Sequence, residues 1–300
     1  MSYSGPIIDP HLHWFGLAAR PNPNLGDLKD KPEGNWYPRH YLQDAEKCPL
    51  QIEGVVHIET IDEVDPIGET TFVNGLQPDL GIKQHVVCFV DLSLPSAAEQ
   101  LAAQAALPNV VGVRHIINHE PSWPNVREDY LSNAVFRANY ALLAQHKLSF
   151  DMQLNPHQML AAAEFVASVP GVPVVIDHLG CLKLTGGDGD AASLAVWRAG
   201  LTALAAVPHV FMKLSMLPYT LAGWHENAEA AATVRGLVRE VIALFGTSRC
   251  MFASNYPVDR LDGVSFGAMY EAFREWTADY SPEEQRALFH TTASGFYRLA

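Results

Sequence analysis

The 300-residue chain is 48% hydrophobic and 18% charged, and its 20 basic and 33 acidic side chains give a formal charge of -13 at pH 7. This composition is typical of a globular protein with a large core, and the length suits one (β/α)₈ barrel. The acidic balance argues against nucleic acid or an anionic membrane surface as a partner, because both require a basic face.

Neither a membrane segment nor an export signal is evident in the sequence. No stretch approaches the roughly 20 apolar residues of a membrane span, and the N-terminus lacks a basic region followed by an apolar segment. The four cysteines form no C-x-x-C pair. We therefore expect a reduced, cytoplasmic protein that acts on a small-molecule substrate, and a homo-oligomer is left open.

Eight short apolar runs alternate with Ala- and Leu-rich segments of helical pattern. The expected strands are Pro6–His11, Ile52–Glu59, Gln84–Asp91, Val110–Ile116, Leu148–Leu154, Val172–His178, His209–Ser215 and Cys250–Asn255. The expected helices are Pro95–Ala106, Ser132–His146, Pro156–Ser168, Ala191–Ala206, Ala228–Phe245, Val264–Ala278 and a last one, Pro282–Leu299, packed outside the strands. Strands alternating with helices predict a parallel sheet, and eight repeats predict a single-domain (β/α)₈ TIM barrel over residues 1–300.

Two segments interrupt this alternation. Gly16–Leu50 is rich in Pro, Asn and Gly and carries Trp36, and Asn118–Tyr130 follows the fourth strand. Because both follow barrel strands, we expect lid-like loops over the mouth at the C-terminal strand ends. Trp36 would there form a platform for substrate, or anchor its loop to the core.

Two histidines one residue apart end the first strand, in Asp9-Pro10-His11-Leu12-His13. Side chains alternate along a strand, so His11 and His13 are expected to share one face. Neutral imidazole is a common ligand of zinc and similar divalent ions. The pair therefore indicates a metal site if a further ligand lies nearby.

Reactive side chains also stand at the expected ends of the other strands, where (β/α)₈ barrels collect their chemistry. They include Glu59, Arg114, Asp151, Gln153, Asp177, His178, Lys213 and Asn255. By alternation, Asp177 should point away from His178 and be structural. Lys213 is expected to contact substrate or to pair with a buried carboxylate, Glu59 or Asp151.

The order and spacing of six short motifs resemble the amidohydrolase superfamily, in its amidohydrolase 2 or lactonase-like branch, over nearly the whole chain. The motifs are Asp9-Pro10-His11-Leu12-His13, Gly112-Val113-Arg114-His115-Ile116, Phe150-Asp151-Met152-Gln153, Ile176-Asp177-His178-Leu179-Gly180, Met212-Lys213-Leu214-Ser215 and Met251-Phe252-Ala253-Ser254-Asn255-Tyr256-Pro257. The resemblance implies that His11 and His13 bind a divalent metal such as zinc. It also implies that His178 binds the metal or polarises the scissile carbonyl, and that Arg114 faces the substrate.

The eighth strand departs from the family pattern, because Asn255 stands where the family has an aspartate. An amide has no useful basicity and cannot take a proton from water. Glu59, Asp177 or Asp259 could act instead, a metal-bound hydroxide could suffice, or hydrolysis has been lost. The missing charge also predicts a metal that is bound weakly or is dispensable.

The leading function implied by the resemblance is a hydrolase that opens a lactone, either a sugar lactone or a carboxylated ring lactone. We assign catalysis to His178, Asn255 and Glu59, and substrate contacts to Arg114, Gln153, Lys213 and Trp36. Two alternatives stay open. One is a metal-dependent decarboxylase of the same superfamily, although the usual fifth-strand histidine is missing and His157 lies two residues too late. The other is a catalytically silent barrel that only binds a ligand.

Overall fold

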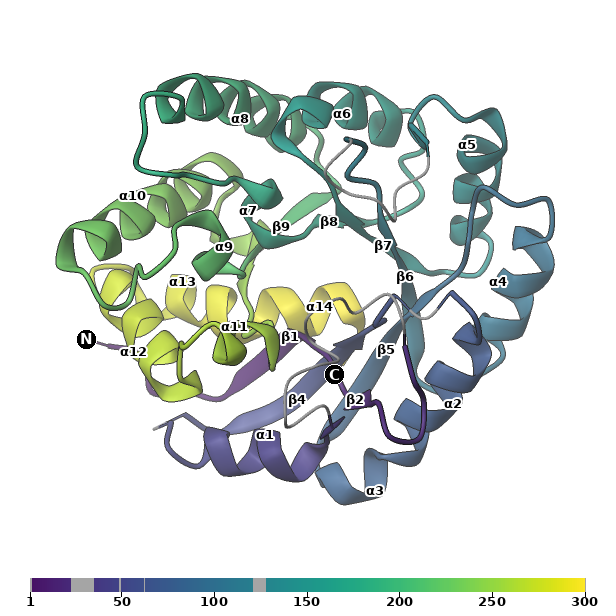
Figure 1. Cartoon of the computed structure of the whole chain (residues 1–300), viewed down its shortest axis with the longest axis horizontal. Coiled ribbons are helices and arrows are strands. Elements are labelled where there is room, and N and C mark those ends of the chain that lie inside the picture. The colour runs from purple at the N-terminus through teal and green to yellow at the C-terminus, as the bar shows by residue number, and fades with distance from the viewer. Residues whose placement is uncertain (1, 23–34, 49, 62, 121–127, 300) are drawn as a thin grey trace.

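The computed structural model describes residues 2–22, 35–48, 50–61, 63–120 and 128–299, and within them the chain forms a barrel of strands surrounded by helices (Figure 1). Eight strands pair in parallel in the order of the chain. They are β1 (Ile7–Leu12), β4 (Ile52–Ile58), β5 (Lys83–Phe89), β6 (Val110–Ile116), β7 (Ser149–Gln153), β8 (Val174–Ile176), β9 (Val210–Leu214) and β10 (Cys250–Phe252). A short antiparallel pair, β2 (Phe15–Gly16) and β3 (Asn35–Trp36), follows β1.

Backbone contacts between β1 and the segment after β10 close the barrel. The amide of His13 donates to the carbonyl oxygen of Tyr256 at 2.7 Å, and the amide of Asn255 donates to the carbonyl oxygen of His11 at 2.9 Å. The predicted TIM barrel is therefore confirmed. Its closure also brings the two histidines of β1 beside Asn255, from the opposite end of the sequence.

The strands are apolar on both faces because helices cover the outside and side chains fill the inside. The residues of β8 and β10, for example, are all buried. Both strands are shorter than predicted, since the chain leaves strand geometry at Asp177 and again at Ala253. The side chains of the polar residues that follow β8 and β10 therefore need not alternate between the two faces of a strand.

The described helices lie outside the strands, with exceptions near the mouth and at the C-terminus. Their bounds are α1 (Pro38–Ala45), α2 (Pro66–Gly75), α3 (Gln77–Leu80), α4 (Ala97–Ala105), α5 (Ala134–Tyr140), α6 (Met159–Ala167), α7 (His178–Cys181), α8 (Asp190–Ala205), α9 (Leu217–Thr220), α10 (Ala228–Phe245), α11 (Val258–Leu261), α12 (Phe266–Trp276), α13 (Pro282–Arg286) and α14 (Thr292–Tyr297). None of these helices is long and apolar enough to cross a membrane.

The C-terminal segment corrects one prediction. The sequence predicts a single outer helix over Pro282–Leu299, but α13 passes into a π-helical turn and then into α14. Figure 1 shows α14 inside the outline of the strand ring. Phe296 and Tyr297 of α14 pack with Ile8, Val175 and other strand residues in a core cluster of their own.

This arrangement makes α14 a plug at the end of the barrel opposite the mouth. The hydroxyl of Tyr297 donates to Asp151 Oδ2 at 2.6 Å, so the plug also reaches the polar centre of the barrel. An amphipathic sequence pattern shows that one face of a helix is buried, but it does not show which part of the protein covers that face. The sequence alone therefore could not distinguish the plug from an outer helix.

We predict that Phe296→Ala lowers the free energy of unfolding by about 3–5 kcal/mol, because it opens a cavity inside the barrel. Leu160→Ala is the control, since that side chain is 54% exposed and its loss should change stability by no more than about 0.5 kcal/mol. Urea unfolding of the variants measures both. Equal, small effects would show that α14 does not fill the barrel.

Candidate active site

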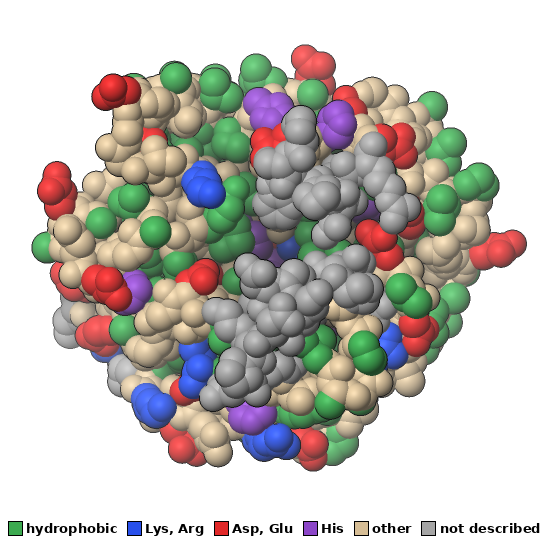
Figure 2. Space-filling view, in the orientation of Figure 1, with side chains coloured by type: hydrophobic (Ala, Val, Ile, Leu, Met, Phe, Trp, Pro, Cys, Tyr) green, Lys and Arg blue, Asp and Glu red, His purple; other side chains and the backbone are tan. Residues whose placement is uncertain are grey.

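Side chains from several strand ends line one cavity of about 220 Å³ at the mouth of the barrel. Its polar lining comprises His13, Glu59, Thr60, Arg114, Gln153, His178 and Asn255. Its apolar lining comprises Phe15, Ile61, Ile116, Met216 and Val258. Figure 2 shows histidine and basic side chains at the bottom of a hollow in the centre of this face. Most of the residues predicted to meet at the strand ends are therefore brought together.

Three imidazole rings, those of His11, His13 and His178, lie close together in the site. The ring centroids of His11 and His13 are 5.0 Å apart, and those of His11 and His178 are 4.4 Å apart. Burial, reinforced by Arg114 and other nearby cations, lowers the pKa of His13 well below its ordinary value and that of His178 to about 3. Burial and the charge of Lys213 lower the pKa of His11 in the same way. All three rings are therefore neutral at neutral pH, the form that can bind a metal.

Hydrogen bonds orient two of these rings. His13 Nδ1 lies 2.8 Å from the carbonyl oxygen of Ile58, which can only accept, so this nitrogen carries the proton and Nε2 keeps a lone pair. His178 Nδ1 lies 2.9 Å from the hydroxyl oxygen of Ser215. In both rings Nε2 is thus left for chemistry.

A left-handed turn follows β8 and corrects the prediction for Asp177. The φ angles of His178, Leu179, Gly180 and Cys181 are 60°, 51°, 65° and 51°. Glycine suits the third position, because residues with a side chain rarely adopt a φ of 65° and a Cβ there would force the Cε of Met159 to move. Since the chain does not continue as a strand, Asp177 and His178 both contact residues of the site rather than pointing in opposite directions.

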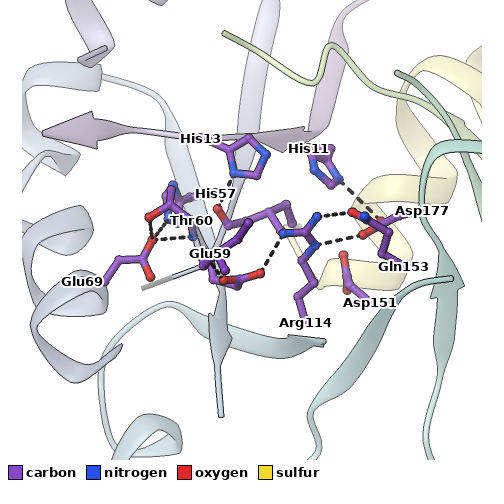
Figure 3. A network of polar contacts seen from close by, with 12 residues as sticks. His11, His13, His57, Glu59, Thr60, Glu69, Arg114, Asp151, Gln153 and Asp177 are labelled. Atoms are coloured by element: carbon purple, nitrogen blue, oxygen red, sulfur yellow. Dashed lines mark hydrogen bonds and ion pairs between the residues drawn. The ribbon is translucent and has the colours of Figure 1, made fainter. Parts of the chain in front are cut away.

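Arg114 makes polar contacts with three other side chains of the site (Figure 3). Its Nη1 donates to Glu59 Oε1 at 2.7 Å, its Nε donates to Asp177 Oδ2 at 3.3 Å, and its Nη2 donates to Gln153 Oε1. Burial alone would raise the pKa of Asp177, but the charges of Lys213 and its other neighbours hold it well below the ordinary value. Arg114 lines the cavity as predicted, although three of its donors are already engaged within the protein.

Glu59 combines burial with access to the cavity. Burial raises its pKa to about 7, against the opposing effect of the Arg114 guanidinium. Its Oε2 accepts from the amide of Ile61 at 2.5 Å. A carboxyl group that is half ionised near neutral pH can accept a proton from water, which the Asn255 amide cannot.

A contact that the sequence did not suggest holds the chain just after Glu59. Glu69, on α2, accepts from the amide of Thr60 at 2.8 Å and from its hydroxyl at 2.7 Å. The same oxygen lies 3.3 Å from His57 Nε2. His57 thus faces α2 and is not among the described residues that line the cavity.

Lys213 lies below the cavity and is completely buried. Its Nζ lies 2.5 Å from Asp151 Oδ2 and 3.1 Å from Asp177 Oδ1. Pairing with Asp151 agrees with the prediction, whereas Glu59 pairs with Arg114 instead. The structure does not place Lys213 where it would contact substrate, because it is not among the described residues that line the cavity.

Asn255 lines the cavity in a left-handed conformation with φ 50°, which asparagine tolerates better than most residues. Its Nδ2 donates to Asp259 Oδ1 at 2.7 Å. Asp259, on α11, is fully buried, and burial raises its pKa well above the ordinary value. Asp259 therefore holds the side chain of Asn255 through this hydrogen bond and is not itself among the described residues that line the cavity.

Trp36 is not among the described residues that line the cavity. Its ring packs edge-on against Tyr256 at 5.6 Å between centroids, and the guanidinium of Arg260 lies 4.8 Å from the ring centre. These contacts favour the loop-anchoring alternative over the substrate platform. Much of both predicted lids, residues 23–34 and 121–127, lies outside the described residues.

The site also contains a group that could hold a divalent ion. His11, Asp177 and His178 each offer a ligand atom, and these atoms lie within 4.8 Å of one another. His11 Nε2 is buried and has no hydrogen-bond partner among the described residues. The donor set suits zinc or a similar ion. It differs from the predicted trio in that Asp177 joins His11 and His178, with His13 beside them.

Comparison with known proteins finds relatives that cover nearly the whole chain. A family model described as Amidohydrolase matches residues 72–299. The uncharacterized protein y4mH of Sinorhizobium fredii is 31% identical over 305 aligned residues, with 98% of each chain covered. An L-fucono-1,5-lactonase of Burkholderia ambifaria is 27% identical, over 97% of this chain and 95% of the relative.

A crystal structure of an amidohydrolase from Burkholderia multivorans with bound zinc has the same fold. It superposes with a TM-score of 0.81 at 27% identity, and the match covers 98% of this chain and 100% of that one.

Proposed function

The chain belongs to the amidohydrolase family, and we propose that it is a hydrolase that opens a lactone. The observation that carries the proposal is Glu59, a carboxyl group with a pKa of about 7 that shares one cavity with two neutral imidazoles and Arg114. A curated relative of nearly the same length is named as a lactonase. The substrate would be a sugar lactone or a carboxylated ring lactone, small enough for a cavity of about 220 Å³.

The proposed reaction uses Glu59 as the general base. Its carboxylate takes a proton from water while the water oxygen attacks the lactone carbonyl carbon. The bond between that carbon and the ring oxygen then breaks, and the protonated Glu59 returns a proton to the leaving oxygen. The product is an open-chain hydroxy acid, and the base is restored.

The other residues of the cavity orient these groups. Arg114 holds Glu59 and carries a positive charge beside the negative charge that develops on the carbonyl oxygen. His178 is held by Ser215 with its Nε2 left for the carbonyl or for a metal. Gln153 fixes the Arg114 guanidinium from the other side.

We propose zinc as the ion that the His11, Asp177 and His178 group would hold. Two observations support it: the imidazole-rich donor set and the zinc bound in a related amidohydrolase. When bound, such an ion would supply Lewis acidity to the carbonyl or lower the pKa of water to about 7. Asn255 offers only a neutral ligand, so we expect weak binding.

The decarboxylase alternative gains no support from the site. His157, the nearest candidate for the missing fifth-strand histidine, is exposed. It lines a separate pocket with residues of α8, and it is not among the described residues of the cavity that contains Glu59.

We predict that the wild-type protein hydrolyses at least one member of a panel of sugar lactones and carboxylated ring lactones. Glu59→Gln should lower kcat by about 10² to 10⁴-fold, because the amide cannot take the proton. Glu53→Gln, at the start of β4, the strand that Glu59 follows, is the matched control and should leave kcat unchanged. Release of acid, followed with a pH indicator, measures the rate.

Turnover by Glu59→Gln at the wild-type rate would remove Glu59 from the role of base. Failure of the wild type on the whole panel would favour the ligand-binding alternative.

We also predict that Asn255→Asp lowers kcat/KM by roughly tenfold at neutral pH. The added negative charge should raise the pKa of Glu59, and one pKa unit corresponds to about 1.4 kcal/mol. Asn255→Ala is the control, because it removes the amide without adding a charge. An increase in kcat/KM for Asn255→Asp would instead mean that hydrolysis runs through a base at the eighth strand and not through Glu59.

A further inference from the structure

Lys213 lies among three polar groups inside the barrel. Its Nζ lies 2.5 Å from Asp151 Oδ2, 3.1 Å from Asp177 Oδ1 and 3.0 Å from His11 Nδ1. An ammonium group has three N–H donors and no lone pair. The side chain is completely buried; its contacts with Asp151 Oδ2 and His11 Nδ1 are hydrogen bonds, and its contact with Asp177 Oδ1 is an ion pair.

This contact determines which nitrogen of His11 carries its proton. If Nδ1 were protonated, two donors would face each other at 3.0 Å. Nδ1 must therefore accept, and a neutral imidazole then has its N–H at Nε2. Asp177 would favour the opposite tautomer, but its Oδ1 lies 3.5 Å from His11 Nδ1, beyond the usual length of such a hydrogen bond.

The two histidines of β1 are thus set as opposite tautomers by their neighbours. The Ile58 carbonyl leaves a lone pair on His13 Nε2, whereas Lys213 leaves a proton on His11 Nε2. A nitrogen that carries a proton cannot bind a metal ion.

We propose that Lys213 is a positioning residue that holds His11 as the Nε2–H tautomer and thereby opposes metal binding at the His11, Asp177 and His178 group. In this state His11 offers a hydrogen-bond donor toward the other imidazoles. It becomes a ligand through Nε2 only when Lys213 gives up its hydrogen bond to His11 Nδ1 and that nitrogen donates to Asp177.

The first test is the tautomer of His11 in the metal-free wild-type protein. Long-range proton–nitrogen correlation spectra of the protein labelled with ¹⁵N-histidine distinguish the two neutral forms, and His11→Asn identifies the resonance. The expected result is a proton on Nε2. A proton on Nδ1 would overturn the proposal, and the measurement needs no mutant that alters Lys213 and no substrate.

The second test removes Lys213 while keeping the buried charge balanced, in the double variant Lys213→Met with Asp151→Asn. Asp177 becomes the nearest partner of His11 Nδ1, so the tautomer should switch. The dissociation constant for zinc, measured by competition with a chelating dye, should fall by about 10 to 100-fold, as for other residues that orient metal ligands.

Lys183→Met is the control, because it deletes an exposed lysine near the barrel mouth and should change neither quantity. An unchanged tautomer in the double variant would contradict the proposal, and so would a switched tautomer with unchanged zinc affinity. Both readouts are independent of lactone hydrolysis, so the proposal fails or survives separately from the proposed function.

Discussion

The structure of the site depends on a group of charges buried inside the barrel. Two cations, Arg114 and Lys213, are enclosed with three carboxylates, Asp151, Asp177 and Glu59. Taking a charge out of water is costly unless a partner of opposite charge compensates it. Asp177 touches both cations, so it links the two halves of the group. Each strand that contributes a member is thereby held in register with its neighbours at the mouth.

This balance also explains how one carboxylate becomes reactive. Asp177, between two cations, keeps a pKa well below the ordinary value, whereas the pKa of Glu59 is raised to about 7. Glu59 is therefore the member whose charge can change near neutral pH. The neutral amide of Asn255 fits the same pattern, because another carboxylate in the cavity would make ionisation of Glu59 harder. The burial of Asp259, which raises its pKa well above the ordinary value, limits negative charge behind Asn255.

Much of the fold and part of the site could be predicted from the sequence. The apolar runs located all eight barrel strands, and their polar ends located His13, Glu59, Arg114, Gln153, His178 and Asn255 around one cavity. These predictions rest on local patterns, namely hydrophobic periodicity and the general rule that barrels place their chemistry at the C-terminal strand ends.

The predictions that differed depend on geometry that one sequence does not reveal. Alternation along an ideal strand placed Asp177 and His178 on opposite faces, but Asp177 keeps an extended backbone and the left-handed turn that begins at His178 brings both side chains into the site. Beside the predicted Asp151, Lys213 also contacts His11 and Asp177, and the plug formed by α14 depends on which surface its apolar face meets. The sequence contained a signal in each case, such as Gly180 after the Asp177-His178 pair. Such a signal could be interpreted only once the three-dimensional structure was known.

The pH dependence of kcat/KM for lactone hydrolysis by the wild-type protein tests the central claim most directly. A general base must be ionised in the free enzyme, and the pKa of Glu59 is about 7. We therefore expect kcat/KM to rise with pH through about 7 and then to level off. A profile that is already level above about pH 5, as an ordinary glutamate with a pKa of about 4.3 would give, would contradict this account of the buried charges.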